Sequence, residues 1–372
     1  MSTQTSLTGH PDTPQTLVVV FLRGGADGLS LVAPLEDDAY YRARPRLGIA
    51  KKDAVALDGF YGLHPLLRPL EAAWKEGDLA IIHGAGSEDQ TRSHFEAQDL
   101  MEHGGLTAGG WLGRFLRTGE GQSALGCVAV GSTLPECLLG APSATVMRSL
   151  DDFALGGGTP ALRAEIQALY AGENDFLGAA GGTTFEALAR IDTMRSVPYR
   201  AAHGAEYETD SFGQGMRQIA QLIKARVGLQ AASIDLDGWD SHFVQQTVID
   251  PLLTRLGKGL ATFRQDLGPD MARTTVVVMT EFGRRVGENS AFGTDHGRGS
   301  VMWVLGGGVR GGQVHTKWPG LREDFLEGPG DLPVLTNYRD VLGPVLRRHG
   351  ASEEAMERIF PEWAGVPVGL YG

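Results

Sequence analysis

The chain has 372 residues, of which 42% are apolar and 21% are charged, as in globular proteins with a large buried core. Its 33 basic and 45 acidic residues leave a net charge of −12, and this negative field argues against a nucleic acid as partner. No apolar run approaches the ~20 residues that span a bilayer, so we expect no membrane partner. A homo-oligomer is compatible with all of these numbers.

Residues 1–16 are polar and rich in turn formers, which predicts a flexible segment ahead of a single domain over residues 17–372. The segment has neither a basic stretch followed by an apolar one nor a twin-arginine pair, so we expect a cytoplasmic protein. The two cysteines, Cys127 and Cys137, have no histidine nearby at ligand spacing. This favours two buried, reduced thiols over a structural zinc site.

Five short apolar runs predict buried strands: residues 17–22, 79–83, 229–236, 274–280 and 301–305. Helical periodicity separates several of them. One apolar stripe runs from Met216 to Val227, and Asp250-Pro251 is typical of the N-cap and first residue of a helix that extends to Leu267. Alternating strands and helices predict an α/β fold, with a mainly parallel central sheet sandwiched by helices.

The middle of the chain, residues 119–215, shows no comparable strand pattern. It contains glycine clusters and two helical stretches, residues 161–170 and 185–195. No long polar linker bounds this segment, so we expect an insertion that packs over the sheet rather than a free domain.

Side chains suited to catalysis or metal binding stand at matching ends of the predicted strands. In an open parallel sheet, ligands bind outside the carboxyl ends of the strands. The candidates are Asp27 after the first strand, Thr91 and Ser93 after the second, Asp237, Asp240 and His242 after the third, Glu281 and Arg284 after the fourth, and Asp295, His296 and Arg298 before the fifth. We therefore expect these groups to meet at one edge of the sheet.

Each cluster taken singly has a simpler interpretation. Asp27 is typical of a residue that caps a turn, and Ser93 with Glu96 is typical of a helix capping box. The run from Asp237 to His242 would also suit a solvated turn. The recurrence of such clusters at five matching positions favours a shared site.

The mixture of carboxylates and imidazoles suits a divalent ion, namely zinc, manganese, magnesium or calcium. Arg284 and Arg298 are candidates to hold an anionic group. Ser93 precedes a predicted helix, whose N-terminus would favour an alkoxide or a bound anion.

Several motifs in this order resemble a large bacterial family, DUF1501, which is sulfatase-like and is grouped with the alkaline-phosphatase-like superfamily. They are FLRGGADGLS, RSHFEAQDLME, DGWDSH, TEFGR and TDHGRGSVMWVLGGGVRGG with WPGL. The resemblance spans roughly residues 17–347 and implies an alkaline-phosphatase-like fold.

The resemblance implies a division of labour among these residues. Asp27, Asp240, His242, Glu281, Asp295 and His296 match metal-ligand positions, and Ser93, or alternatively Thr91, matches the nucleophilic hydroxyl. Phe282 stands where a ligand histidine is expected, which argues against a complete two-zinc site. Asp237 stands where relatives carry glycine and is not counted as a ligand.

The resemblance and the residues together predict a metal-dependent hydrolase of phosphate or sulfate esters, with a small-molecule or carbohydrate anionic ester as substrate. One alternative is a non-catalytic metal- or ligand-binding member of the same fold, which the departure at Phe282 favours. Another is a metal-dependent mutase or carbohydrate-modifying enzyme.

Overall fold

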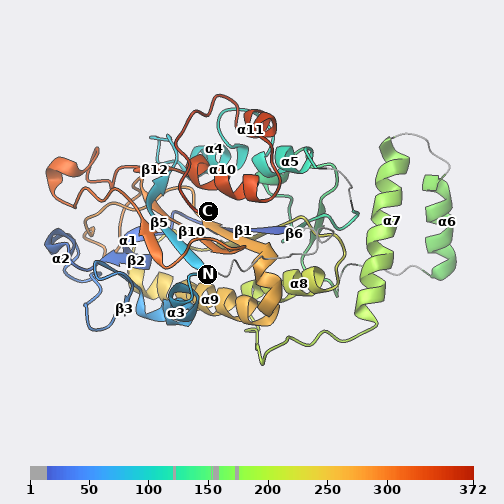
Figure 1. Cartoon of the computed structure of the whole chain (residues 1–372), viewed down its shortest axis with the longest axis horizontal. Coiled ribbons are helices and arrows are strands. Elements are labelled where there is room, and N and C mark those ends of the chain that lie inside the picture. The colour runs from blue at the N-terminus through green and yellow to red at the C-terminus, as the bar shows by residue number, and fades with distance from the viewer. Residues whose placement is uncertain (1–14, 120–122, 152, 154–158, 172–175) are drawn as a thin grey trace, which may run out of the picture.

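A nine-stranded sheet forms the centre of the molecule (Figure 1). The computed structural model describes residues 15–119, 123–151, 153, 159–171 and 176–372, so the predicted flexible segment 1–16 lies outside the described residues except at its end. The strand order is β11-β5-β10-β9-β1-β8-β6-β7, with β12 paired to β5. The strands are β1 (Thr16–Arg23), β5 (Leu79–Gly86), β6 (Cys127–Val130), β7 (Thr145–Met147), β8 (Ala231–Asp237), β9 (Thr274–Met279), β10 (Ser300–Gly306), β11 (Gln313–His315) and β12 (Thr336–Asn337).

The sheet is mainly parallel, as the sequence predicts. Of its described strands, only β10 is reversed, since it runs antiparallel to both β5 and β9. The central strand β1 pairs in parallel with β8 and β9, so that Leu17 lies opposite Ala231 on one side and Thr275 on the other. The carboxyl ends of β1, β5, β8 and β9 therefore share one edge with the amino end of β10.

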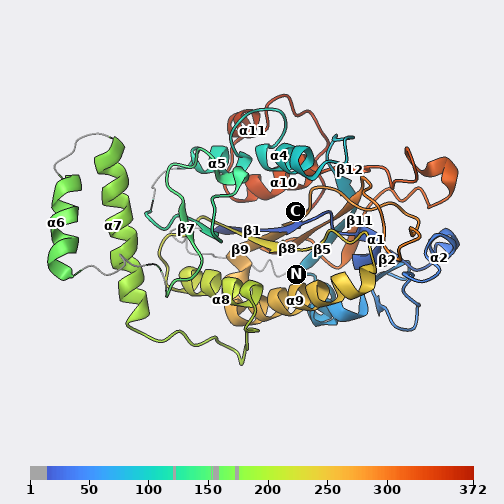
Figure 2. The ribbon, with the colours of Figure 1, turned by 180° about the vertical axis from the view of Figure 1, so that it is seen from behind.

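Helices cover both faces of this sheet (Figures 1 and 2). One layer contains α4 (His94–His103), α5 (Trp111–Leu116), α10 (Tyr338–Arg348) and α11 (Glu353–Ile359), and the other contains α3 (Glu71–Lys75), α8 (Ser211–Lys224) and α9 (Gln245–Leu267). Successive residues of β1 enter opposite layers: Val19 belongs to the core cluster of α10, and Val20 to that of α9. Burial on both faces explains why this strand is apolar at every position.

The middle segment differs from the expectation of an insertion over the sheet. Strands β6 and β7 extend the sheet itself, with Cys127 paired to Ala231 of β8. The predicted helices are present as α6 (Pro160–Ala171) and α7 (Phe176–Arg195), and both extend beyond the β7 edge (Figures 1 and 2). Ala187 and Ile191 of α7 join the core cluster that also contains residues of α8 and α9. The two short strands escaped prediction because four and three residues give little periodic signal.

Helix α9 begins at Gln245, before the predicted start at Asp250-Pro251. Pro251 is accommodated inside the helix. The amide groups of Val244 and Gln245 donate to the carbonyl oxygens of Ala291 and Phe292 at 3.0 and 2.9 Å. Carbonyl groups from a distant loop thus satisfy amides at the helix start, a role for which the local sequence offers no side chain.

A smaller sheet of β2 (Val32–Pro34), β4 (Tyr61–Leu63) and β3 (Val55–Ala56) accompanies α1 (Gly28–Leu31) and α2 (Asp38–Ala43). Short 3-10 helices complete the chain: η1 (Pro65–Leu70), η2 (Glu136–Leu138), η3 (Gly268–Arg273) and η4 (Glu323–Phe325). Both cysteines are buried free thiols. Within the described ranges, no helix is long and apolar enough to cross a membrane.

Candidate metal centre

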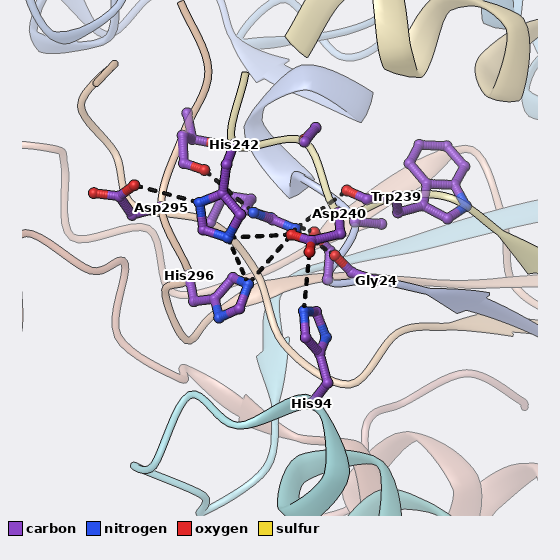
Figure 3. A network of polar contacts seen from close by, with 12 residues as sticks. Gly24, His94, Trp239, Asp240, His242, Asp295 and His296 are labelled. Atoms are coloured by element: carbon purple, nitrogen blue, oxygen red, sulfur yellow. Dashed lines mark hydrogen bonds and ion pairs between the residues drawn. The ribbon is translucent and has the colours of Figure 1, made fainter. Parts of the chain in front are cut away.

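Four polar side chains from three segments converge at the shared edge of the sheet (Figure 3). Ligand atoms of His94, Asp240 and His296 all lie within 4.8 Å of one another. His242 joins them, because its Nε2 atom lies 3.2 Å from Asp240 Oδ1 and 2.9 Å from His296 Nε2. The four residues come from the start of α4, the loop after β8 and the loop before β10.

All three imidazoles are oriented by an acceptor behind them. His94 donates from Nδ1 to Glu281 Oε1 at 2.9 Å, His242 to Asp295 Oδ1 at 3.4 Å, and His296 to the carbonyl oxygen of Arg92 at 2.9 Å. In a neutral imidazole a proton on Nδ1 leaves a lone pair on Nε2. Each Nε2 atom is therefore available as a ligand atom, and each lies near Asp240.

Two observations indicate that the Nε2 atoms of the three histidines are arranged to bind a cation and not to form hydrogen bonds with each other. The Nε2 atom of His94 is buried and has no hydrogen-bond partner among the described residues. The Nε2 atoms of His242 and His296 face each other, although neither carries a proton when Nδ1 is the donor. An electron-pair acceptor between these atoms would satisfy all of them, and acceptors at Nδ1 are the usual support of metal-binding histidines.

Glycine allows the loops to approach closely enough to form the cluster. A Cβ atom on Gly24 would lie 2.4 Å from the backbone nitrogen of Asp240, and Gly24 has a φ of +120°. A Cβ atom on Gly293 would lie 2.3 Å from the carbonyl oxygen of His242. Both contacts are shorter than a side chain tolerates, so these positions require glycine.

The ionisation of Asp240 and His296 also favours a cation. Burial raises the pKa of Asp240, but the hydrogen bond and charge of Arg284 outweigh it and leave the net pKa below its usual value. Burial and the charge of Arg284 lower the pKa of His296, which favours the neutral form that binds metals. The pKa of Glu281 is also lowered, because the hydrogen bond from His94 is among those that overcome its burial.

The structure brings together three of the six predicted ligands: Asp240, His242 and His296. It places two others one hydrogen bond behind the cluster. Glu281 is fully buried and accepts from His94, and Asp295 accepts from His242. These two carboxylates were expected to be ligands. They are not in the cluster, because His94 stands between Glu281 and the other ligand atoms, and His242 stands between Asp295 and those atoms.

Asp27 does not join the cluster. It is 1% exposed and accepts hydrogen bonds from both terminal nitrogens of Arg44, at 2.5 and 3.0 Å, and from Ser30 and Gln245. Its side chain also accepts from the amide of Leu29 as the N-cap of α1. A buried ion pair thus occupies its oxygens, in agreement with the simpler capping interpretation.

The two arginines expected to hold an anion are engaged elsewhere. Arg284 is 1% exposed and donates to the carbonyl oxygens of Gly24, Gly25, Thr294 and Trp239 and to Asp240 Oδ1, at 2.8 Å for the last. It therefore holds the loops of the site in place. Arg298 pairs with Glu327 and donates to the carbonyl oxygen of Asp89.

The two candidate hydroxyls differ in their surroundings. Ser93 is the N-cap residue of α4, but its side chain makes no capping hydrogen bond, so the expected capping box is not formed. Thr91 is engaged: its hydroxyl donates to Asp89 Oδ1 at 2.9 Å and accepts from the amide of Ser93 at 3.1 Å. Asp237 is exposed and is not in the cluster.

His94 is a candidate ligand that sequence reasoning missed. It follows Ser93 directly, at a position where the sequence indicates only a hydroxyl nucleophile or a helix cap. Phe282 explains the departure noted in the sequence, because its ring packs at 4.9 Å from the ring of His94 and at 4.8 Å from that of His296. The Phe282 ring therefore occupies the position at which the family resemblance leads one to expect a ligand of a second metal ion.

Comparisons with known proteins identify the family of the chain and structures that are similar to it. No curated protein matches the chain. The chain is similar to the C-terminal periplasmic domain of EcEptC from Escherichia coli, solved in complex with zinc, at 10% identity and a TM-score of 0.38 over 79% of this chain and 73% of that one. It is similar to a 2-O GAG sulfatase at 11% identity and a TM-score of 0.38 over 96% and 74% of the two chains.

Both structural likenesses are low, and the fold described above rests on the strand order and register themselves. The family model described as "Protein of unknown function (DUF1501)" matches residues 165–356, which are 192 of the 372 residues. This range includes Asp240, His242 and His296 of the cluster, although it begins after His94. The chain belongs to the DUF1501 family, as its motifs indicate.

Proposed function

We propose that the cluster of His94, Asp240, His242 and His296 binds a divalent metal ion and that the protein is a metal-dependent hydrolase of phosphate or sulfate esters. The observation that carries this proposal is the arrangement of three Nε2 lone pairs around one ionised carboxylate, each imidazole supported at Nδ1. Three imidazoles with one carboxylate favour zinc over magnesium or calcium, which prefer oxygen ligands.

An ion in this position would supply a Lewis acid that stabilises charge on an ester oxygen. The residues of the chain prepare the site for it. Arg284 holds Asp240 and the adjacent loops through its hydrogen bonds, and Phe282 covers the ring faces of His94 and His296. Glu281 and Asp295 keep protons on Nδ1 atoms and thus keep the Nε2 atoms available as ligands.

The nucleophile has three candidates: Ser93, Thr91 and a water molecule. Ser93 is favoured over Thr91 because its hydroxyl makes no capping hydrogen bond, whereas the Thr91 hydroxyl is engaged with Asp89. Ser93 directly precedes His94 in the chain, and a serine hydroxyl activated by a bound metal ion can act as the nucleophile of a covalent step.

The engagement of Arg284 and Arg298 favours a second candidate function. An esterase for anionic substrates needs groups that hold the non-bridging oxygens, and the two arginines expected in that role donate to other partners. A metal- or ligand-binding protein without turnover would need no such groups.

Metal analysis and turnover distinguish these functions. We expect purified protein to contain close to one divalent ion per chain and to hydrolyse 4-nitrophenyl phosphate or sulfate in a chelator-sensitive manner. His94→Ala should lose both metal and turnover. His103→Ala is the matched control, since this histidine lies on the same helix and contacts Glu136 instead of the cluster. Bound metal without turnover of either ester would support the non-catalytic function, and protein that binds no metal would contradict the hydrolase and any metal-binding function.

Substitution of the hydroxyls then identifies the nucleophile. Ser93→Ala should retain metal and lose several orders of magnitude in turnover if a covalent step is abolished. Thr91→Ala should lose far less. Full activity in both variants would assign the attack to water.

A further inference from the structure

A pocket of about 510 Å³ opens at the same edge of the sheet as the candidate metal centre. The ends of β6, β7 and β8 and the first residue of α8 line it. Its polar lining includes Ser132, Thr133, Arg148, Ser211, Asp235 and Asp237. The pocket is adjacent to the centre along the chain, because Asp237 comes only three residues before Asp240.

The wall of this pocket is connected to the centre by hydrogen bonds. Arg23 donates to both oxygens of Asp235 at 2.8 and 3.2 Å, and from Nη1 to Gln98 Oε1 at 3.3 Å. Gln98 donates in turn to Glu281 Oε1 at 2.9 Å, which accepts from His94. The position of Asp235 is therefore fixed relative to a candidate metal ligand.

The pocket offers hydrogen-bonding groups of three kinds. The carboxylates of Asp235 and Asp237 only accept, the guanidinium of Arg148 only donates, and the serine and threonine hydroxyls do both. Asp235 is bound to Arg23 yet keeps a side chain that is 35% exposed. Among the described residues, neither Asp237 nor Arg148 has an ion-pair partner, although both line the same pocket.

This mixture favours a ligand that both donates and accepts hydrogen bonds. An apolar group would leave the carboxylates and the guanidinium unpaired, and a purely anionic or purely cationic group would meet a like charge. A group with several hydroxyls can donate to the carboxylates and accept from the guanidinium at the same time. The volume is within the range of pockets that enclose small organic ligands.

We infer that this pocket binds a polyhydroxylated group, such as a single sugar ring, that forms the non-reacting part of the substrate. The inference rests on the proposed function only in assigning the bound group to a substrate of the metal centre. The binding itself does not require turnover and is tested without it.

The test of binding uses methyl glycosides of glucose, galactose, mannose and N-acetylglucosamine, with cyclohexanol as a ring-shaped control that has one hydroxyl. Saturation-transfer NMR on the full chain should show binding of at least one glycoside in excess of cyclohexanol. Asp237→Asn and Arg148→Ala should each weaken that binding about tenfold, as expected for loss of a hydrogen bond to a charged group. The exposed pair Asp324→Asn and Arg322→Ala provides matched controls that should bind like the wild type.

The outcomes separate the pocket from the proposed function. Glycoside binding no stronger than that of cyclohexanol, or equal binding by the double variant of Asp237 and Arg148, would overturn the inference, even if the protein hydrolyses 4-nitrophenyl phosphate. Glycoside binding that depends on Asp237 in a protein that hydrolyses no ester would uphold the pocket while the proposed function fails. Where both hold, the phosphate or sulfate ester of the bound sugar should show a KM at least tenfold higher in Asp237→Asn than in the wild type.

Discussion

Replacement of Asp27 by asparagine separates a structural role from a ligand role at this position. The substitution keeps the size of the side chain but removes the charge that faces Arg44, whose side chain is fully buried. Loss of one partner of a buried ion pair typically costs about 3–5 kcal/mol, because the remaining charge is left uncompensated. The entropy of unfolding of a 372-residue chain is about 0.8 kcal/mol/K, so the melting temperature should fall by about 4–6 °C.

Thermal and urea unfolding of the wild type and Asp27→Asn measure this loss, and metal analysis of the same samples checks the ligand role. We expect Asp27→Asn to be less stable but to contain as much metal as the wild type. Asp38→Asn is the control, since this exposed residue should change stability by less than about 0.5 kcal/mol. Loss of metal with unchanged stability would refute the reasoning and return Asp27 to the ligands.

The same pair predicts a dependence on pH. Burial raises the pKa of Asp27, but the charge and hydrogen bonds of Arg44 outweigh it, so the folded pKa lies below the value of about 3.9 in an unfolded chain. The stabilisation is therefore complete above that unfolded value and is lost as the pH falls through the folded pKa. The stability difference between wild type and Asp27→Asn should thus be constant from pH 7 to 5 and shrink below about pH 4.

Three further substitutions test the support of the centre and the backbone around it. Glu281→Gln should weaken metal binding about 10–100-fold because it removes the charge behind His94, and an unchanged dissociation constant in metal titrations would exclude that role. Arg284→Lys should lower the free energy of unfolding by about 3 kcal/mol and reduce metal affinity, since lysine cannot donate to all the carbonyl groups that Arg284 reaches. Urea unfolding identical to that of the wild type would contradict this. Val244→Gly should raise the free energy of unfolding by about 1 kcal/mol, because a β-branched residue is strained at a φ of +40°, and a less stable variant would argue that no strain is released there.

The architecture of the sheet was predictable because its signal is local. The strands β1, β5, β9 and β10 are buried on both faces and are mostly apolar, which the sequence displays directly. Strand β8 gives a weaker signal, because Ser233, Asp235 and Asp237 interrupt its apolar residues. The rule that ligands bind at the carboxyl ends of parallel strands then placed Asp240 and His242 at one edge. His296 lies at the same edge because β10 is reversed, so that its amino end is there. Strands β6 and β7 were too short to give such a signal, and only the pairing of β6 with β8 and of β7 with β6 reveals them.

The sequence by itself determined which segments approach the site, because periodicity reveals the alternation of strands and helices, and this alternation implies parallel strands whose carboxyl ends share one edge. It did not determine which side chain faces which, since that depends on contacts between residues far apart in the chain. Glu281 contacts His94 across 187 positions, Arg44 contacts Asp27 from another loop, and Arg284 reaches back to the loop after β1. Only the tertiary structure could therefore distinguish the imidazoles and the carboxylate that converge on one point from the carboxylates and guanidinium groups that hold them there.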